Sequence, residues 1–191
     1  LIAINTRIDI IMLGFFCSDY WVGIYGFAAI LAQGLFQLII VLRNNYNPLL
    51  AQMYAKKDTD ELRAMVRKGK KVAFAMMLCA GLVGVVSFPV MVRACGLDPT
   101  FMESWAVLAV LVAGIVAAAG YGPFRSVLLQ FGFPGSHTSI FVVTTLLNIC
   151  ANYYLIPHLG IIGAAIATVV ADICSIVLLV LLTRHRTGIR I

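Results

Sequence analysis

Charged residues are scarce in this sequence. Only 12% of the 191 residues are Asp, Glu, Lys or Arg, whereas 62% are hydrophobic, and the mean hydropathy is +0.99. A typical soluble domain has about 25% charged residues, because its surface must be solvated. The composition therefore excludes an ordinary soluble domain, and it predicts an all-α protein that crosses a membrane several times.

Several sequence motifs of enzymes are also absent. The chain has no GxxxxGK[ST] phosphate-binding loop, no HExxH zinc motif and no GxSxG nucleophile motif. Its five cysteines show no CxxC spacing, so we interpret them as small hydrophobic residues. We therefore predict no enzymatic activity, no cofactor and no metal site.

The charges that are present divide the sequence into long apolar stretches. A helix needs about 20 mostly apolar residues to cross the hydrocarbon core of a bilayer. Five stretches come close to this length or exceed it, and they are 20–42, 72–92, 104–124, 139–156 and 159–183. The last contains a single charge, Asp172. With the apolar segment at 1–16, these stretches predict six transmembrane helices.

Lys and Arg residues gather at two places along the chain. These are the loop between the second and third predicted helices and the C-terminal tail, with Lys56, Lys57, Arg63, Arg67, Lys68, Lys70, Lys71, Arg184, Arg186 and Arg190. Because basic residues beside short loops stay in the cytoplasm, both ends of the chain are predicted to be cytoplasmic. The net charge of +6 then reflects topology and contact with membrane lipids, and we predict no nucleic-acid partner.

The basic loop has a helical pattern of its own. Asp58 is followed three residues later by Glu61, as in a capping box, and Leu62 and Val66 are four positions apart on one face. We predict a short amphipathic helix at about 58–70 that lies on the cytoplasmic membrane surface. A solvated linker helix is the alternative.

Uncharged polar residues occur at helical spacing inside the apolar stretches. Gln37 and Asn44 share one face of the second predicted helix, and Asn148 and Asn152 share one face of the fifth. Such side chains either join helices through hydrogen bonds or line a hydrated cavity. The spacing is compatible with both.

Four ionisable residues lie within or at the edge of apolar stretches, and they are Arg7, Asp9, Arg125 and Asp172. A charge at the centre of a membrane helix costs roughly 2.5 to 3.5 kcal/mol, so each is expected to have a function or a partner. Arg7 and Asp9 point to different sides of a helix and are poor partners for each other. For Asp172 three roles stay open: pairing with Arg125 or Arg7, binding a coupling proton or sodium ion, or accepting hydrogen bonds from neighbouring helices.

One segment carries a family resemblance. The stretch NYYLIPHLGIIGAAIATVVAD, 152–172, resembles a signature in the second lobe of the O-antigen type polysaccharide flippases. Their superfamily also contains the MATE multidrug exporters and the lipid II flippases. RIDIIMLGFF, VGIYGFAAIL and NPLLAQMYAKKDTDELR are similar to the start of the same lobe. The resemblance implies that 1–191 forms one six-helix lobe of a MATE-like fold, which faces an N-terminal lobe missing from this sequence or a second copy.

The resemblance also implies a function. Such flippases move undecaprenyl-pyrophosphate-linked oligosaccharides across the bacterial inner membrane by alternating access, for polysaccharides such as the O-antigen of lipopolysaccharide. Cavity cations hold the pyrophosphate, and Arg7 and Asp9 match the charged start of the lobe. With the residues chosen from the sequence pattern, the candidates for substrate binding are Arg7, Asp9, Gln37, Asn44 and Arg125. Asp172 and Asn148 are candidates for ion coupling or for lining the cavity. Arg43 is either at the cytoplasmic mouth of the cavity or an anchor at the membrane interface.

Other functions are weighed against this one. A cation-coupled MATE-type drug exporter would favour acidic and aromatic cavity residues, which the candidate arginines argue against. A membrane-embedded glycan polymerase or ligase would normally carry a large outward loop, and the predicted outward loops are short. A structural subunit is a further alternative, since one lobe is incomplete as a transporter.

Overall fold

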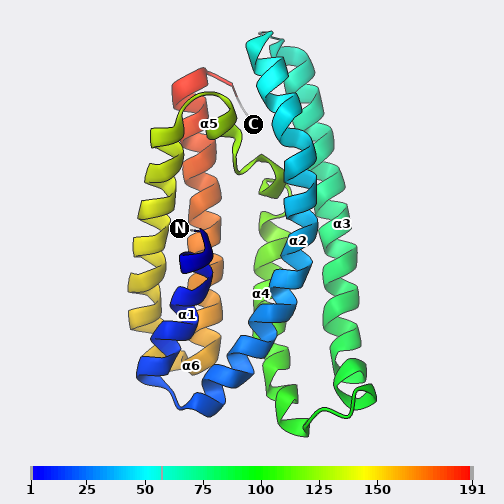
Figure 1. Cartoon of the computed structure of the whole chain (residues 1–191), viewed down its shortest axis with the longest axis vertical. Helices are drawn as coiled ribbons and strands as arrows, with labels where there is room; N and C mark the ends of the chain where they lie inside the picture. The colour runs from blue at the N-terminus through cyan, green and yellow to red at the C-terminus, as the bar shows by residue number, and fades with distance from the viewer. Residues whose placement is uncertain (1, 57, 190–191) are drawn as a thin grey trace.

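The computed structural model describes residues 2–56 and 58–189, with side chains from residue 7 onward. Within these residues every regular element is a helix (Figure 1). The elements are α1 (Ile2–Phe16), α2 (Asp19–Ala55), α3 (Thr59–Ala94), the 3-10 helix η1 (Pro99–Glu103), α4 (Ser104–Ala118), the 3-10 helix η2 (Gly122–Phe124), α5 (Val127–Gln130) and α6 (Pro134–Thr187). The prediction of an all-α protein is therefore confirmed for the described part of the chain.

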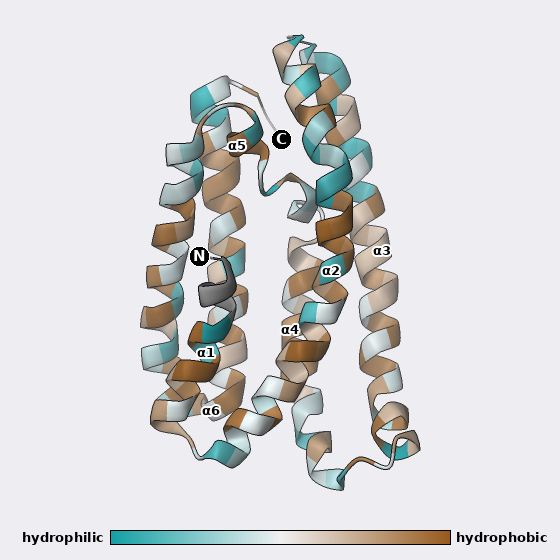
Figure 2. Cartoon of the chain, viewed as in Figure 1, coloured by the Kyte–Doolittle hydropathy of each residue, from teal (hydrophilic) through white to brown (hydrophobic). Residues whose placement is uncertain are grey.

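Among the described residues, four helices are long and apolar enough to cross a membrane, namely α2, α3, η1 continued by α4, and α6. Large apolar side chains such as Phe15, Ile30 and Val86 are exposed on the outside, as expected where lipid replaces water. Figure 2 shows hydrophilic residues gathered where α2 and α3 join, and hydrophobic residues along the middle of the helices. These features describe a multi-pass membrane protein.

Helix α6 consists of two arms that run side by side (Figure 1). The chain reverses at Gly160, whose backbone angles of φ 58° and ψ −137° are not helical. A positive φ is readily adopted by glycine, because it has no Cβ. The arms correspond to the fifth and sixth predicted helices. Helix α1 has only 15 residues, whereas a membrane crossing needs about 20. The total of six membrane crossings therefore stays a prediction.

Close packing of the two arms depends on a second glycine. A Cβ atom built on Gly163 would collide with the backbone carbonyl of Leu155 in the other arm. Backbone atoms cannot rotate away as a side chain can. We therefore expect Gly163→Ala to lower the free energy of unfolding by about 1 to 3 kcal/mol, measured in detergent with a chemical denaturant.

A matched glycine serves as the control for this prediction. A Cβ on Gly34, in the interior of α2, would meet no atom within 4 Å. Gly34→Ala is expected to leave stability unchanged or raise it by up to about 1 kcal/mol, because alanine favours helix. Equal stability of the Gly163→Ala variant and the wild type would contradict the packing argument.

The fourth predicted span, 104–124, is wrong at its C-terminal end. Helix α4 ends at Ala118 and is followed by tight turns, in which the amide of Tyr121 donates to the carbonyl of Ala118 at 3.1 Å. Gly120 lowers helix propensity there, and Pro123 has no amide hydrogen to donate. The irregular link that results places Arg125 at the C-terminal cap of η2.

The separate amphipathic helix predicted at about 58–70 is also wrong, because these residues form the first turns of α3. The predicted start is confirmed: the carboxylate of Asp58 accepts a hydrogen bond from the amide of Glu61 at 3.1 Å. Leu62 and Val66 are buried in a hydrophobic cluster with Phe124. The apolar face thus packs against protein, and the helix continues without interruption through Pro89 to Ala94.

Faces of small residues bring α4 and α6 together. A Cβ on Gly114 of α4 would collide with the side chain of Val169 in α6, and Ala118, Ala164 and Ala167 are all buried. Small residues let helix backbones approach closely in membranes, where dispersion contacts drive association. This contact brings the end of α4, and with it the link that carries Arg125, close to the second arm of α6.

Candidate functional site

A buried carboxylate on α1 forms the centre of the first polar cluster. Asp9 is only 5% exposed, and it accepts hydrogen bonds from the hydroxyl of Tyr25 at 3.0 Å, from Nδ2 of Asn152 at 2.8 Å and from the hydroxyl of Thr168 at 2.5 Å. Nδ2 of Asn152 also donates to Oδ1 of Asn148 at 3.1 Å. We call these five residues the Asp9 network. It joins α1 to α2 and to both arms of α6.

Asp9 and Arg7 occupy different sides of α1. Arg7 is exposed while Asp9 is buried, and among the described residues Arg7 has no ion pair. This confirms that the two residues are poor partners for each other. Their roles in substrate binding stay predictions.

The second polar cluster contains an ion pair. Nη1 of Arg125 lies 3.2 Å from Oδ1 of Asp172, and the two side chains are 20% and 33% exposed. The pair connects the link after η2 to the second arm of α6. Asp172 follows Thr168 by four residues, so the pair lies one helical turn from the Asp9 network. Of the three roles left open for Asp172, the structure contains the pairing with Arg125.

Most of the Arg125 guanidinium lacks a hydrogen-bond partner. Atoms Nε and Nη2 are shielded from solvent, and neither has an acceptor among the described residues. The ring of Phe36 lies 5.6 Å from Cζ and covers part of the group. The hydrogens on Nε and Nη2 point in the same direction, so this side of the group matches two oxygens of a phosphate or a carboxylate. We call it the free edge of Arg125.

The face of α2 that packs against η2 carries a second arginine, Arg43. A Cβ on Gly122 of η2 would contact Ile39, and the ring of Tyr46 lies 5.3 Å from that of Phe124. Arg43 is four positions after Ile39 and three before Tyr46, so it lies on the face of α2 that packs against η2.

Two electrostatic interactions extend the cluster. The positive charge of Arg125 acts on Arg43. The charge of Arg43 in turn acts on His137, at the start of α6. With Asp172 these residues form the Arg125 cluster. The sequence pattern gave no sign of His137, since it lies in the turn-rich segment FGFPGSHTS. Arg43 was only one of several basic residues at helix ends.

The structure groups the sequence-predicted candidates differently from the prediction. Asn148 belongs to the Asp9 network, and Asp172 belongs to the Arg125 cluster. Gln37 and Asn44 are exposed on α2. In the sequence, each directly follows a residue on the face of α2 that packs against η2. Within the described residues, no hydrogen bond joins either side chain to the two clusters.

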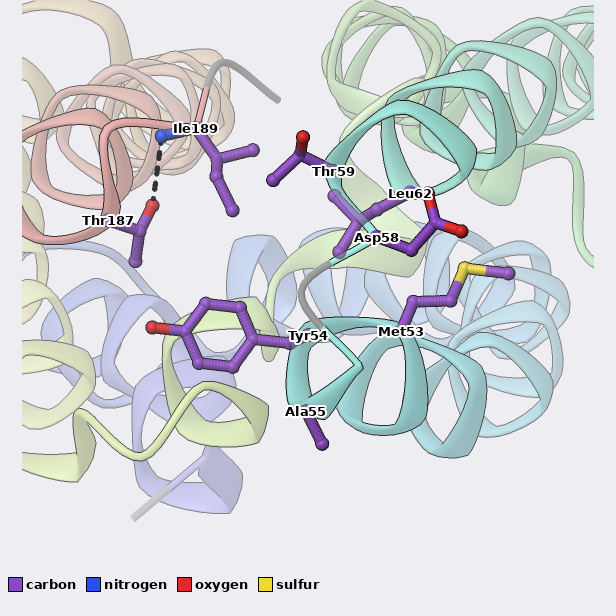
Figure 3. Close-up of a pocket in the computed structure, with 8 residues that line it drawn as sticks. All are labelled: Met53, Tyr54, Ala55, Asp58, Thr59, Leu62, Thr187 and Ile189. Carbon is purple, nitrogen blue, oxygen red and sulfur yellow. Dashed lines mark hydrogen bonds between the residues drawn. The ribbon is translucent and has the colours of Figure 1, made fainter.

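Cavities also lie elsewhere in the part of the chain that the structure describes. One, of about 470 Å³, lies where the ends of α2 and α6 meet the start of α3, and its lining includes Tyr54, Leu62 and Ile189 (Figure 3). Another, of about 480 Å³, lies near Gly160 and includes Trp21 and Glu103. Both have mainly apolar walls, and neither includes Arg125.

The fold and these two clusters define a class: a multi-pass helical membrane protein with charged groups inside its helix bundle. The chain is 30% identical over 171 residues to the probable flippase AglR of Haloferax volcanii, an alignment covering 86% of this chain and 35% of the relative. It is 24% identical over 166 residues to an uncharacterised membrane protein of Methanocaldococcus jannaschii, covering 87% of this chain and 38% of that protein.

The chain thus spans little more than a third of the length of the curated relatives it matches. No family model and no solved structure matches it. The similarity supports a flippase-like membrane protein, and a transporter rather than an enzyme. The finer resemblance to O-antigen flippases and to the MATE superfamily stays a prediction, as does the bacterial inner membrane.

Proposed function

We propose that this chain is one lobe of a flippase that moves lipid-linked oligosaccharides across a membrane by alternating access. The free edge of Arg125 carries this proposal. A partly buried guanidinium with two shielded and unpartnered nitrogens is costly, and the phosphate of a lipid headgroup supplies the oxygens that it lacks. Similarity to a probable flippase supports the same conclusion.

The headgroup of such a lipid suits the charge of the site. A pyrophosphate carries more than one negative charge, and Arg43 and Arg125 supply two positive charges from separate elements. Guanidinium groups bind phosphate through fixed pairs of donors, and the attraction is stronger where water is excluded. In this proposal the prenyl chain stays in the lipid while the sugar crosses on the protein side.

The remaining candidates surround this site in the proposal. Arg7, Gln37 and Asn44 are exposed in this lobe, and they face a cavity shared with the missing lobe or a second copy. There they bind the sugar or the headgroup. Asn148 and Asp9 belong to one network, so a coupling ion that uses Asn148 would meet Asp9 before Asp172.

Reconstitution of the complete protein into liposomes tests the proposed function. A fluorescent lipid-pyrophosphate oligosaccharide is placed in both leaflets, and the fraction accessible to an external quencher is followed over time. Protein-dependent exchange between leaflets is expected, whereas protein-free liposomes should show none. Equal rates with and without protein would contradict the proposal.

The competing function, drug export, has a separate readout. A cation-coupled exporter would extrude a cationic dye from cells in response to an ion gradient. We expect no dye extrusion above the level of an empty vector, because the Arg125 cluster repels cations. Dye export without glycan-lipid exchange would replace the proposal with the drug exporter.

A further inference from the structure

We propose that Asp172 is an exchangeable counterion: it neutralises Arg125 while the site is empty, and a phosphate group of the ligand takes its place. The identity of the ligand rests on the proposed function. The exchange itself concerns any ligand with a phosphate or pyrophosphate group.

Arg125 needs a counterion when no ligand is bound to it. A partly buried guanidinium close to a second arginine is unfavourable unless a negative charge offsets it. Asp172 provides the nearest such charge, at 3.2 Å. Among the described residues the other ion pair, Arg63 with Asp60, lies within α3 and is far more exposed. Asp172 with Arg125 is therefore the one described ion pair that links separate elements.

The bond between the two is weaker than a guanidinium can make. Asp172 uses a single oxygen on a single nitrogen, and 3.2 Å exceeds the roughly 2.7 to 2.9 Å of a strong charge-assisted hydrogen bond. The free edge, where an oxyanion would accept two parallel bonds, is not used. A phosphate therefore has a better bonding geometry available to it than Asp172 has.

Charge favours exchange over simple addition of the ligand. A phosphate bound at the free edge would lie beside the carboxylate of Asp172, and two negative groups in a poorly hydrated site repel each other. Asp172 is one-third exposed, so its carboxylate can turn to solvent when it leaves. Nε and Nη2 are closed to solvent in this structure, so the ligand reaches them only after a neighbouring group moves.

Departure of Asp172 would also release a link between elements. The pair holds the link after η2 to the second arm of α6. Occupancy of the site by phosphate is thereby coupled to the packing of α6. The exchange gives the site a way to respond to its ligand.

Binding of inorganic pyrophosphate to the complete protein in nanodiscs of neutral lipid tests the exchange. By calorimetry, Asp172→Asn is expected to bind pyrophosphate roughly three- to tenfold more tightly than the wild type, because the competing charge is gone. Asp172→Glu keeps the charge and is expected to bind like the wild type. Asp60→Asn breaks the exposed pair with Arg63 and should change nothing. Arg125→Gln should bind at least about tenfold more weakly, with or without Asp172→Asn.

Equal or weaker binding by Asp172→Asn would overturn the exchange, and so would unchanged binding by Arg125→Gln. A measurement on the wild type covers the case in which a variant does not fold. The carbon-13 carboxyl resonance of Asp172 should shift on addition of pyrophosphate. An unchanged Asp172 resonance would also overturn the proposal.

Two further binding measurements distinguish the possible sources of the phosphate. One uses a soluble prenyl pyrophosphate as the ligand, and the other uses nanodiscs that contain phosphatidylglycerol. Tighter binding of the prenyl pyrophosphate than of pyrophosphate supports exchange with a lipid-linked substrate. If phosphatidylglycerol alone displaces pyrophosphate in the wild type, the exchange stands and the ligand is a membrane phospholipid. The liposome assay reports separately on the flippase function, so each proposal fails on its own measurement.

Discussion

Arg125→Ala should reduce exchange of lipid-linked oligosaccharide between leaflets by roughly 10- to 100-fold, because charged hydrogen bonds of this kind contribute about 1.5 to 3 kcal/mol. Ligand binding is lost with the free edge, while the protein should still reach the membrane in normal amounts. The reconstituted liposome assay measures the rate, and quantitative immunoblotting of membranes measures the amount.

Two controls make this result specific to the guanidinium. Arg93 is exposed in the last turn of α3, a helix that contributes no residue to the Arg125 cluster, and Arg93→Ala should exchange lipid at the wild-type rate. Arg125→Lys keeps the charge but has no edge of parallel donors, so it should restore only part of the rate. Full activity of Arg125→Ala would remove Arg125 from the proposed site.

Asp9→Ala is expected to have the largest effect on stability, lowering the free energy of unfolding by about 2 to 4 kcal/mol. The substitution leaves the donors of Tyr25, Asn152 and Thr168 without their common acceptor inside the bundle. Each buried donor left unpaired costs about 1 to 3 kcal/mol, and the sum is reduced because Asn152 can still donate to Asn148 and Thr168 to the carbonyl of Ala164. Unfolding by denaturant in mixed micelles measures the change.

Two variants separate the carboxylate from its surroundings. Asp9→Asn keeps the shape and one acceptor oxygen, so it should lose less stability than Asp9→Ala. Asp60→Ala removes an exposed acid and should change stability by no more than about 1 kcal/mol. If Asp9→Ala unfolds like Asp60→Ala, the Asp9 network does not hold the four helical segments together.

Several elements were readable from local sequence alone. The apolar stretches located the long helices, because the cost of burying charge in lipid determines where charges occur. Asp58 with Glu61 marked the start of α3, because capping uses atoms within one turn.

Other elements could not be read this way. The pattern at 58–70 predicted a surface helix because an apolar face looks the same whether lipid or protein covers it. The end of α4 was placed too late because an uncharged stretch does not show where a helix stops. Asp172 and Asn148 were given the same candidate role, ion coupling or lining of a cavity, whereas packing directs the two to different partners.

The amino-acid sequence by itself determined that this protein belongs in a membrane and where its long helices lie, since hydropathy and helix length act over short segments. The tertiary structure alone decided which polar groups meet. Asp9 takes its donors from residues 16, 143 and 159 positions away, and Arg125 reaches Asp172 across 47 positions. Such partners are selected by helix packing, because a buried charge must find its counterpart among whatever the fold brings beside it.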